Sequence, residues 1–180
     1  MLLHSSNHSR DCRSACGQST LTLQLPDEAA SRALADQLAP LLGHGMVVWL
    51  SGDLGAGKTT LARALLRRLG YSGPVKSPTY TLVEVYVVSS IYWYHFDFYR
   101  FNEAEEFEEA GLAEYFRDDC VCLVEWPEKA AGHVPPADLE LVFHFAEAPQ
   151  SGRILGLHAR SEAGQRCLTT LQNLWPHAGN

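Results

Sequence analysis

Residues 46–69 place a glycine-rich loop between a short apolar run and an amphipathic segment. The loop reads Gly52-Asp53-Leu54-Gly55-Ala56-Gly57-Lys58-Thr59 and matches the pattern G-x-x-x-x-G-K-S/T. Residues 46–50 resemble a buried parallel strand, and residues 59–69 carry leucines at helical spacing. This order of strand, loop and helix is the context in which the pattern binds phosphate, so we expect an α/β fold. The alternative is a glycine-rich turn without a ligand.

Each residue type in the loop suits phosphate chemistry. Glycines let backbone N–H groups curl around phosphate oxygens, and the N-terminus of the next helix adds positive potential. Lys58 would reach the β- and γ-phosphates, and the Thr59 hydroxyl would bind Mg²⁺. The sequence therefore predicts ATP and Mg²⁺ as ligands. The predicted nucleotide contacts in the loop are Asp53, Leu54, Gly55, Ala56, Gly57, Lys58, Thr59 and Thr60.

Two carboxylates follow apolar, strand-like runs. Asp97 ends the run 91–96, and Glu125 ends the run 121–124. An enzyme with this loop needs a strand-end carboxylate to hold Mg²⁺ or its water and to polarise the attacking water. We expect Asp97 near Mg²⁺ and Glu125 as a water-orienting residue or outer-shell metal ligand, with Lys58 completing the catalytic set. Their roles can be exchanged, and the alternative is a pair of exposed strand-end acids.

Two further residues are expected near the nucleotide. Thr79 lies in the segment Ser77-Pro78-Thr79-Tyr80-Thr81, whose hydroxyls suit a loop that senses the γ-phosphate, although a simple proline turn explains the same residues. Trp126 follows Glu125. Its ring is more typical of packing than of an adenine platform, but it would report nucleotide binding by fluorescence.

The rest of the chain predicts one domain over residues 20–180, after a disordered tail at 1–19. The expected sheet is mainly parallel and flanked by helices on both faces, as in P-loop NTPases, with an antiparallel hairpin and extra C-terminal strands. The expected strands are 20–25, 46–50, 81–86, 91–98, 121–125, 139–145 and 154–159, and the expected helices are 27–42, 59–69 and 102–116. Acids at 103–109 indicate a solvated helix face or a docking surface.

The tail contains His4, His8, Cys12 and Cys16 at intervals of four residues. All four are metal-ligand types, but known zinc sites use other spacings, so an unstructured tail is the favoured interpretation.

Composition limits the partners and the compartment. Lys and Arg number 14 against 21 Asp and Glu, a net charge of -7, so the chain is a poor candidate for binding nucleic acid by itself. No apolar stretch approaches the roughly 20 residues that a membrane helix needs. Residues 1–18 lack the apolar core of a secretory signal. With five cysteines and no export signal, we expect reduced thiols in the cytoplasm.

Four blocks, taken together and in order, resemble the TsaE family, formerly called YjeE. They are GDLGAGKTT at 52–60, VKSPTYTLVE at 75–84, HFDFYR at 95–100 and LVEW at 123–126. The third block is similar to the family signature H-F-D-x-Y-R. The flanking strand pattern extends the likeness over roughly residues 20–160.

The resemblance implies a bacterial ATPase that joins the TsaB–TsaD heterodimer, which makes N6-threonylcarbamoyladenosine on adenosine 37 of tRNA. In the family, TsaD carries the transfer chemistry, and TsaE uses ATP to keep the complex turning over and is slow alone. By match of motif, Lys58 and Thr59 hold phosphate and Mg²⁺, Asp97 and Glu125 serve the catalytic side, and Thr79 belongs to the switch-like loop. The tRNA contact is then mainly indirect. The longer tail and the Ser89-Ser90 hairpin turn without glycine depart from the family.

Two other functions fit the same loop. A small P-loop kinase acting on a metabolite would need arginines in a lid, whereas Arg100, Arg117, Arg153, Arg160 and Arg166 are scattered. A nucleotide-gated binding module would use ATP only to switch an interface.

Overall fold

The computed structural model describes residues 19–147 and 151–175. The predicted tail 1–19 therefore lies, apart from Ser19, outside the described residues, as does the question of its four metal-ligand side chains. Order along the chain begins as expected, with a strand at Thr20.

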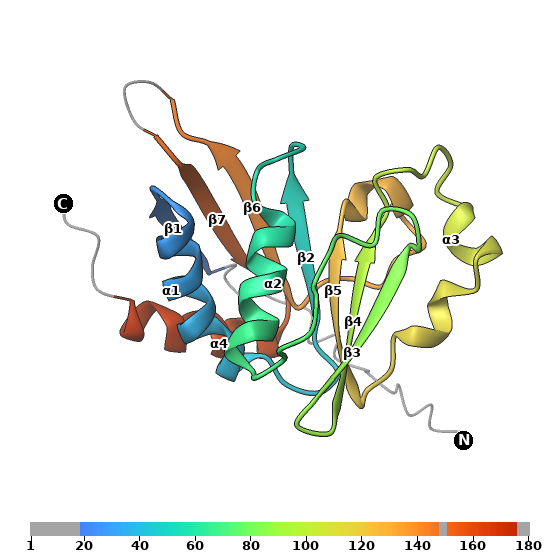
Figure 1. The fold of residues 1–180 in the computed structure, drawn as a ribbon, viewed down its shortest axis with the longest axis horizontal. Helices are drawn as coiled ribbons and strands as arrows, with labels where there is room; N and C mark the ends of the chain where they lie inside the picture. Colours follow the sequence, from blue (N-terminus) through green and yellow to red (C-terminus); the bar gives the residue numbers. More distant parts are fainter. Residues whose placement is uncertain (1–18, 148–150, 176–180) are drawn as a thin grey trace, which may run out of the picture.

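A seven-stranded sheet runs through the described part of the chain in the order β1-β7-β6-β2-β5-β4-β3 (Figure 1). The central strands β6, β2, β5 and β4 are parallel, whereas β3 on one edge and β7 and β1 on the other are antiparallel to their neighbours. The prediction of a mainly parallel sheet thus holds for the centre only, and the whole sheet is mixed. The strands are β1 (Thr20–Leu25), β2 (Val47–Gly52), β3 (Val83–Val88), β4 (Ile91–Asp97), β5 (Cys120–Glu125), β6 (Leu139–Phe145) and β7 (Arg153–Ala159).

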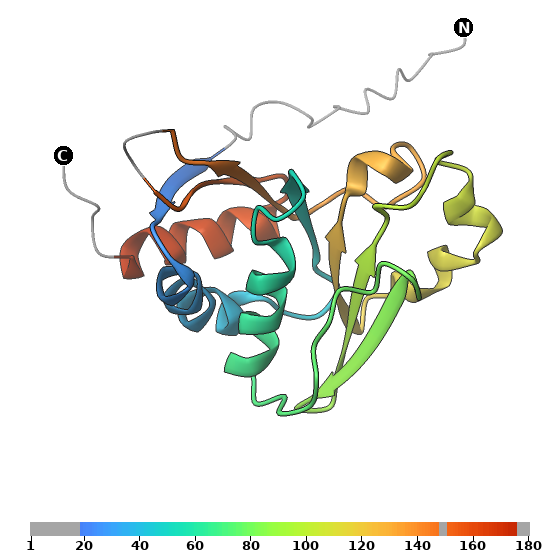
Figure 2. The same cartoon turned by 45° about the horizontal axis from the view of Figure 1, so that its top comes forward.

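Three longer helices contribute to one apolar core, which they share with the sheet. They are α1 (Glu28–Leu38), α2 (Lys58–Arg68) and α4 (Glu162–Leu174), and Figure 2 shows them grouped together. Leu34, Leu65 and Leu168 are fully buried in this cluster. The apolar residues of each helix form one stripe, and burial of these stripes against the sheet holds the three helices on this face.

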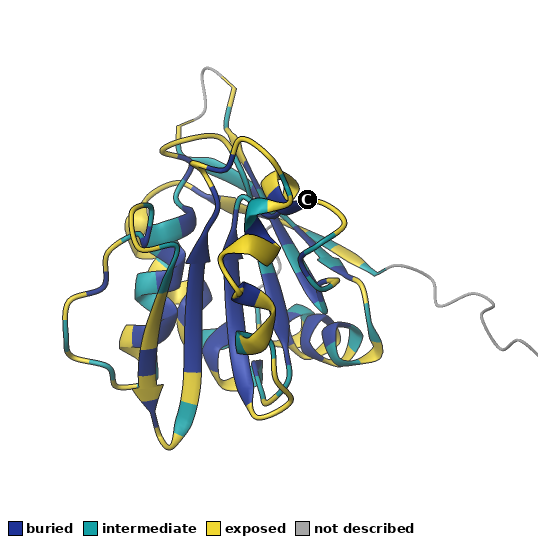
Figure 3. Cartoon of the chain, turned by 90° about the vertical axis from the view of Figure 1, so that its right-hand side faces the viewer, coloured by how far each residue is buried: buried dark blue, intermediate teal, exposed yellow. Residues whose placement is uncertain are grey.

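The opposite face carries shorter elements over an aromatic cluster. They are α3 (Glu106–Glu109) and the 3₁₀ turns η2 (Leu112–Tyr115) and η3 (Pro127–Ala130). Phe96 stacks on Phe116 with ring centroids 4.8 Å apart, and Phe98 stacks on Phe101 at 4.9 Å. Figure 3 shows α3 exposed on its outer side, in front of buried strands. Helical elements thus lie on both faces, as expected.

The strand predictions agree with the structure to within two residues at either end, but two helix predictions need correction and one helix was not predicted. The expected helix 102–116 is wrong, because the chain forms only the short α3 and η2 there. Gly111 separates the two with φ +65, a left-handed conformation that ends a helix. The Glu106 carboxylate accepts the backbone amides of Asn102 and Glu103 at 2.7 and 3.0 Å, so regular helix starts four residues later than predicted.

The expected helix 27–42 is capped by the Asp27 carboxylate, which accepts the Ala30 amide at 2.9 Å, as predicted. It ends earlier than expected, however, because α1 passes into a 3₁₀ turn at Ala39–Leu41 (η1), where Pro40 has no N–H to donate. Helix α4 was not predicted at all.

The β3–β4 turn meets its backbone requirement without glycine. Ser89 and Ser90 have φ values of 51° and 68°, the positive values that a two-residue hairpin turn needs at both positions. The two serines thus depart from the glycine of the family pattern, but they adopt the positive φ values that the turn requires.

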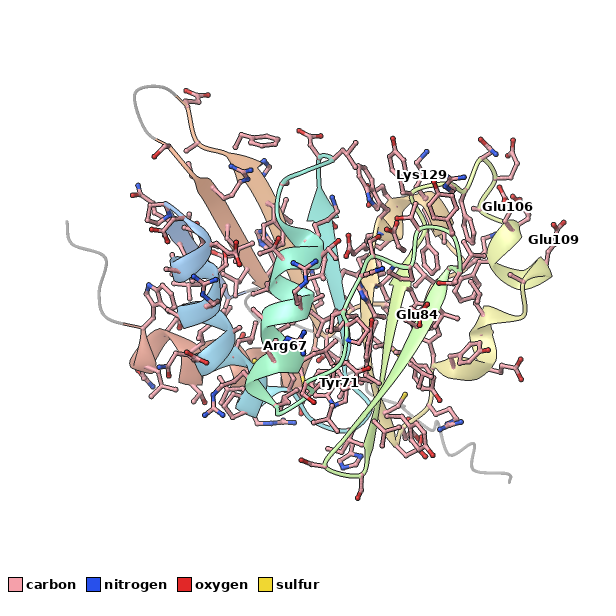
Figure 4. The ribbon with its side chains drawn as sticks, in the orientation of Figure 1. Arg67, Tyr71, Glu84, Glu106, Glu109 and Lys129 are labelled. Carbon is pink, nitrogen blue, oxygen red and sulfur yellow. The ribbon has the colours of Figure 1, made fainter. Side chains whose placement is uncertain are left out.

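The acids around α3 form a solvated edge. In Figure 4, Glu106 and Glu109 lie at the right-hand edge of the molecule, whereas Arg67 and Tyr71 lie near the middle of the view. Two of the acids have local partners: Glu106 caps backbone amides, and Glu108 meets the His133 ring at 2.9 Å. The solvated-face interpretation accounts for both.

We predict that Gly164→Ala strongly destabilises the fold. Gly164 sits in the first turn of α4, where an added Cβ would overlap the backbone carbonyl oxygen of Asp138. Since backbone cannot move as a side chain can, we expect a loss of about 3 kcal/mol in the free energy of unfolding, measured by urea titration. Gly43→Ala is the matched control, because its Cβ would meet nothing within 4 Å. Equal stability of the two variants would contradict the packing argument.

Candidate functional site

The glycine-rich loop joins the end of β2 to the start of α2 at the carboxyl edge of the parallel strands (Figure 1). Gly52 has φ +129, and a Cβ there would overlap the carbonyl oxygen of Phe143 on β6. Gly57 has φ +112 and is the N-cap residue of α2. Only glycine fits these two positions without strain. Gly52 lets the loop pass close to β6, and Gly57 lets the chain turn into α2.

Lys58 is the first residue of α2 and is only 4% exposed. Its Nζ donates to the carbonyl oxygens of Gly52 and Asp53 at 2.5 and 2.8 Å and lies 4.0 Å from the centroid of the Trp126 ring. Burial lowers the pKa of the Lys58 ammonium, while nearby carboxylates, Glu125 foremost, act in the opposite direction. The loop thus holds a buried cation against its own backbone.

Asp97 and Glu125 stand side by side at the ends of β4 and β5. They are direct register partners in the parallel ladder, and Glu125 is also paired with Leu50 of β2. Each is only 3% exposed. The expectation that both carboxylates reach the carboxyl edge beside the loop is confirmed as geometry, and the alternative of exposed strand-end acids is wrong.

Glu125 ties the loop helix to β4. Its Oε1 accepts the Thr59 hydroxyl at 2.7 Å and the His95 Nε2 at 2.8 Å. His95 is fully buried, and its Nδ1 has no hydrogen-bond partner among the described residues. A carboxylate only accepts, so the proton of this hydrogen bond lies on the His95 Nε2. His95 therefore donates to Glu125 and fixes its side chain.

Asp97 ties the segment after α2 to the site. Its Oδ2 accepts the hydroxyls of Ser77 and Thr79, the latter at 2.7 Å, and its Oδ1 accepts the Tyr99 amide at 3.0 Å. The Ser-Pro-Thr segment is thus bound to a strand-end carboxylate, which a simple proline turn does not require.

A cavity of about 300 Å³ lies where these side chains meet. Most of the predicted nucleotide, metal and catalytic residues line it, and Ser77 and Tyr99 join them. Asp53 and Ala56 do not line it: Asp53 contributes its carbonyl to Lys58, and Ala56 faces a second cavity of about 220 Å³. The two cavities share Gly55, Gly57 and Thr60. The predicted residues on the first are Leu54, Gly55, Gly57, Lys58, Thr59, Thr60, Thr79, Asp97, Glu125 and Trp126.

Trp126 occupies an unusual backbone position. Its φ is 58°, and its ring lies 5.1 Å from that of Tyr99. The ring packs between Tyr99 and the Lys58 ammonium, which agrees with the packing interpretation and keeps the indole at the cavity.

The sequence alone predicts no role for His95 or Arg153. His95 does leave a signal in the sequence, because it is a polar residue in the otherwise apolar run 91–96. It stands two positions before Asp97 and therefore lies on the same side of the strand. Arg153 donates to the Ala56 and Gly55 carbonyls at 3.0 Å each. It gave no signal, because nothing in the sequence shows that β7 reaches the loop.

Comparisons with known proteins show the family of the chain. Residues 25–154 match the family described as "Threonylcarbamoyl adenosine biosynthesis protein TsaE". The chain belongs to the TsaE family. The "tRNA threonylcarbamoyladenosine biosynthesis protein TsaE" of Haemophilus influenzae is 39% identical over 159 residues, covering 86% of this chain and 99% of that relative. The protein of the same name from Bacillus subtilis is 39% identical over 121 residues, covering 67% of this chain and 74% of that relative.

A solved structure supports the arrangement of the elements. The crystal structure of Bacillus subtilis YdiB superimposes with a TM-score of 0.74 at 28% identity, covering 87% of this chain and 97% of that chain. The mixed α/β fold is therefore shared with a solved protein over most of its length.

Two features are absent from the described residues. Within 19–147 and 151–175, no three or more His, Cys, Asp or Glu side chains gather in a way that would hold a metal ion. No helix in this part of the chain is both long and apolar enough to span a membrane.

We predict that His95→Leu destabilises the fold through Glu125. Leucine cannot donate, so the buried carboxylate loses one of its two hydrogen bonds, and the free energy of unfolding should fall by about 1–3 kcal/mol in urea titration. His95→Gln supplies an amide donor and should lose less. If the glutamine variant is as unstable as the leucine variant, the ring's packing rather than its hydrogen bond is what matters.

Proposed function

We propose that this TsaE-family chain is a P-loop ATPase that binds ATP and Mg²⁺ at the first cavity and supports N6-threonylcarbamoyladenosine modification of tRNA. One observation carries the proposal above the others: the hydroxyl of Thr59, at the start of the loop helix, is hydrogen-bonded to Glu125 beside the buried Lys58. The tRNA role comes from the relatives, which are named for threonylcarbamoyladenosine biosynthesis.

The loop supports ATP as the ligand. Its glycines turn the backbone at the N-terminus of an 11-residue helix, where unpaired amides and the helix dipole favour an anion. Lys58 is already held at the loop and needs only to exchange backbone carbonyls for phosphate oxygens. These features favour a P-loop NTPase fold for the region around β2 and α2.

Oxygen donors at the cavity fit Mg²⁺. This ion is usually held by one or two carboxylates together with substrate phosphates and water, so a site built wholly from protein side chains is not required. Thr59 would hold it directly, with Asp97 or Glu125 binding it or its waters. When bound, Mg²⁺ would neutralise charge on the phosphates.

Hydrolysis would use the same two carboxylates. Glu125 is fixed by Thr59 and His95, so it would orient a water at a defined distance from the loop. Asp97 holds Ser77 and Thr79, so a change at Asp97 on nucleotide binding would be passed to that segment. Thr79 would thereby act as a switch residue, and Trp126 would report the event.

The proposed partner is the TsaB–TsaD heterodimer, with tRNA contacted mainly through it. A net charge of -7 suits a helper that leaves phosphate-backbone binding to others. The proposed location is the cytoplasm. Cys120, Cys122 and Cys167 are free, buried thiols, and thiols stay reduced in that compartment.

We predict that the TsaB–TsaD heterodimer stimulates phosphate release from ATP by the purified chain, and that Lys58→Ala abolishes it. The lysine is the cation closest to the phosphates in the proposed site, so its loss should lower the rate by about 100-fold or more. Hydrolysis without stimulation would remove the partner from the proposal and give the metabolite kinase priority. ATP binding without turnover in a single-turnover experiment would favour the nucleotide-gated binding module.

We also predict that Asp97→Asn and Glu125→Gln each lower the rate of hydrolysis by about 100-fold, because each keeps the side chain's shape and removes its charge. Steady-state phosphate release at saturating ATP and Mg²⁺ measures the effect. Glu84→Gln, on the exposed side of β3, is the matched control and should hydrolyse at the parent rate. Parent rates in both site variants would show that the carboxylates do not serve the chemistry.

A further inference from the structure

Arg153, the first residue of β7, reaches across to the glycine-rich loop 97 residues before it in the chain. Its Nε donates to the Ala56 carbonyl and its Nη2 to the Gly55 carbonyl, each at 3.0 Å. Its Nη1 donates to the carbonyl of Gly152 at 2.9 Å. The guanidinium thus bridges two consecutive carbonyls of the loop and the carbonyl of Gly152, the residue before β7.

Arg160, at the other end of β7, has a partner of a different kind. Arg160 follows the end of β7 and lies 2.6 Å from the Glu140 carboxylate, where its charge is compensated. The three hydrogen bonds of Arg153, by contrast, all go to backbone carbonyls, and its planar group lies 4.3 Å from the Phe145 ring. Stacking and the fixed fork of the guanidinium give it one orientation, which suits a geometric task.

The carbonyls that it engages belong to two consecutive peptide units of the loop, Gly55–Ala56 and Ala56–Gly57. The Gly55–Ala56 unit donates its N–H to the Asp53 carbonyl at 3.1 Å, which closes a turn within the loop. The Ala56–Gly57 unit ends in the N–H of Gly57, the N-cap of α2. A cation on the carbonyl side holds each unit in place and polarises it, so that its N–H becomes a better donor.

We propose that Arg153 is a positioning residue for the nucleotide site: it holds the Gly55 and Ala56 carbonyls, which keeps the turn that the Ala56 amide closes and directs the Gly57 amide at the phosphates. The inference rests on the proposed ATP-binding function. It makes the β6–β7 strand pair part of the site, since β6 touches the loop through Phe143 at Gly52 and β7 touches it through Arg153. Arg153 also lines the second cavity, together with Gly55, Ala56 and Thr60.

A positioning role predicts that Arg153 acts on affinity. Loss of two charge-assisted hydrogen bonds from a preformed loop should weaken ATP binding by about 10- to 100-fold. The catalytic carboxylates lie on β4 and β5, away from β7, so kcat at saturating ATP should stay at the parent value while KM rises.

The test compares Arg153→Met, Arg153→Lys and Arg160→Met with the parent chain. Binding of Mg-ATP is measured by isothermal titration calorimetry, and KM and kcat are measured with the TsaB–TsaD heterodimer present. We expect Arg153→Met to lose affinity by the stated factor. Arg153→Lys should recover only part of it, because an ammonium cannot span two carbonyls as the guanidinium fork does. Arg160→Met should bind as the parent does.

Three results would overturn the inference. Arg153→Met binding ATP as tightly as Arg160→Met would show that the bridge is not needed. Full recovery in Arg153→Lys would show that charge alone matters. Failure of the parent chain to bind ATP would contradict both the proposed function and this inference. The first two results would contradict the inference alone. Should Arg153→Met be unfolded at the assay temperature, the lysine variant decides, since unchanged affinity contradicts the bridge and partial loss supports it.

Discussion

The hydrogen bond between Thr59 and Glu125 joins the parts of the molecule on which the site depends. Thr59 belongs to the first turn of α2, Glu125 ends β5, and His95 fixes the same carboxylate oxygen from β4. One oxygen therefore sets the distance from the loop helix to two neighbouring strands. The parallel register of β2, β5 and β4 makes this possible, because it brings Leu50, Glu125 and Asp97 to one level of the sheet. A shift of one residue in β4 or β5 would turn the carboxylate of that strand to the other face of the sheet.

The loop itself is shaped from outside as much as by its own glycines. On one side the backbone at Gly52 is so close to Phe143 that no side chain fits. On another side Arg153 binds two of its carbonyls. From within, Lys58 binds the carbonyls of Gly52 and Asp53. An anion site made of backbone amides needs such external support, because free amides in a mobile loop would lose conformational entropy on binding.

How far the sequence predicts this structure depends on how local each signal is. The strands around the loop were found because an apolar run ending in Asp97 or Glu125 is a local pattern, and Asp27 was found as a helix cap for the same reason. The helix 102–116 failed because the Glu106 side chain binds the backbone and Gly111 adopts a left-handed conformation, and both effects outweigh a periodic pattern. The order of the strands, the donor role of His95 and the reach of Arg153 are contacts between residues far apart in the chain, which periodicity does not encode.

The charges of the site explain why an acidic protein can be proposed to bind a polyanion. Asp97 and Glu125 are both buried at the cavity, and Lys58 is the buried cation that faces them. One ammonium against two carboxylates leaves an excess of negative charge where a triphosphate would have to enter, and like charges in a buried site repel strongly. The proposed Mg²⁺ resolves this conflict, since a divalent cation arriving with the nucleotide would reverse the sign of the balance. In the proposed function the carboxylates would then select the magnesium complex of ATP over the free nucleotide, and the ion and the loop, rather than the net charge of the chain, would set the affinity for phosphate.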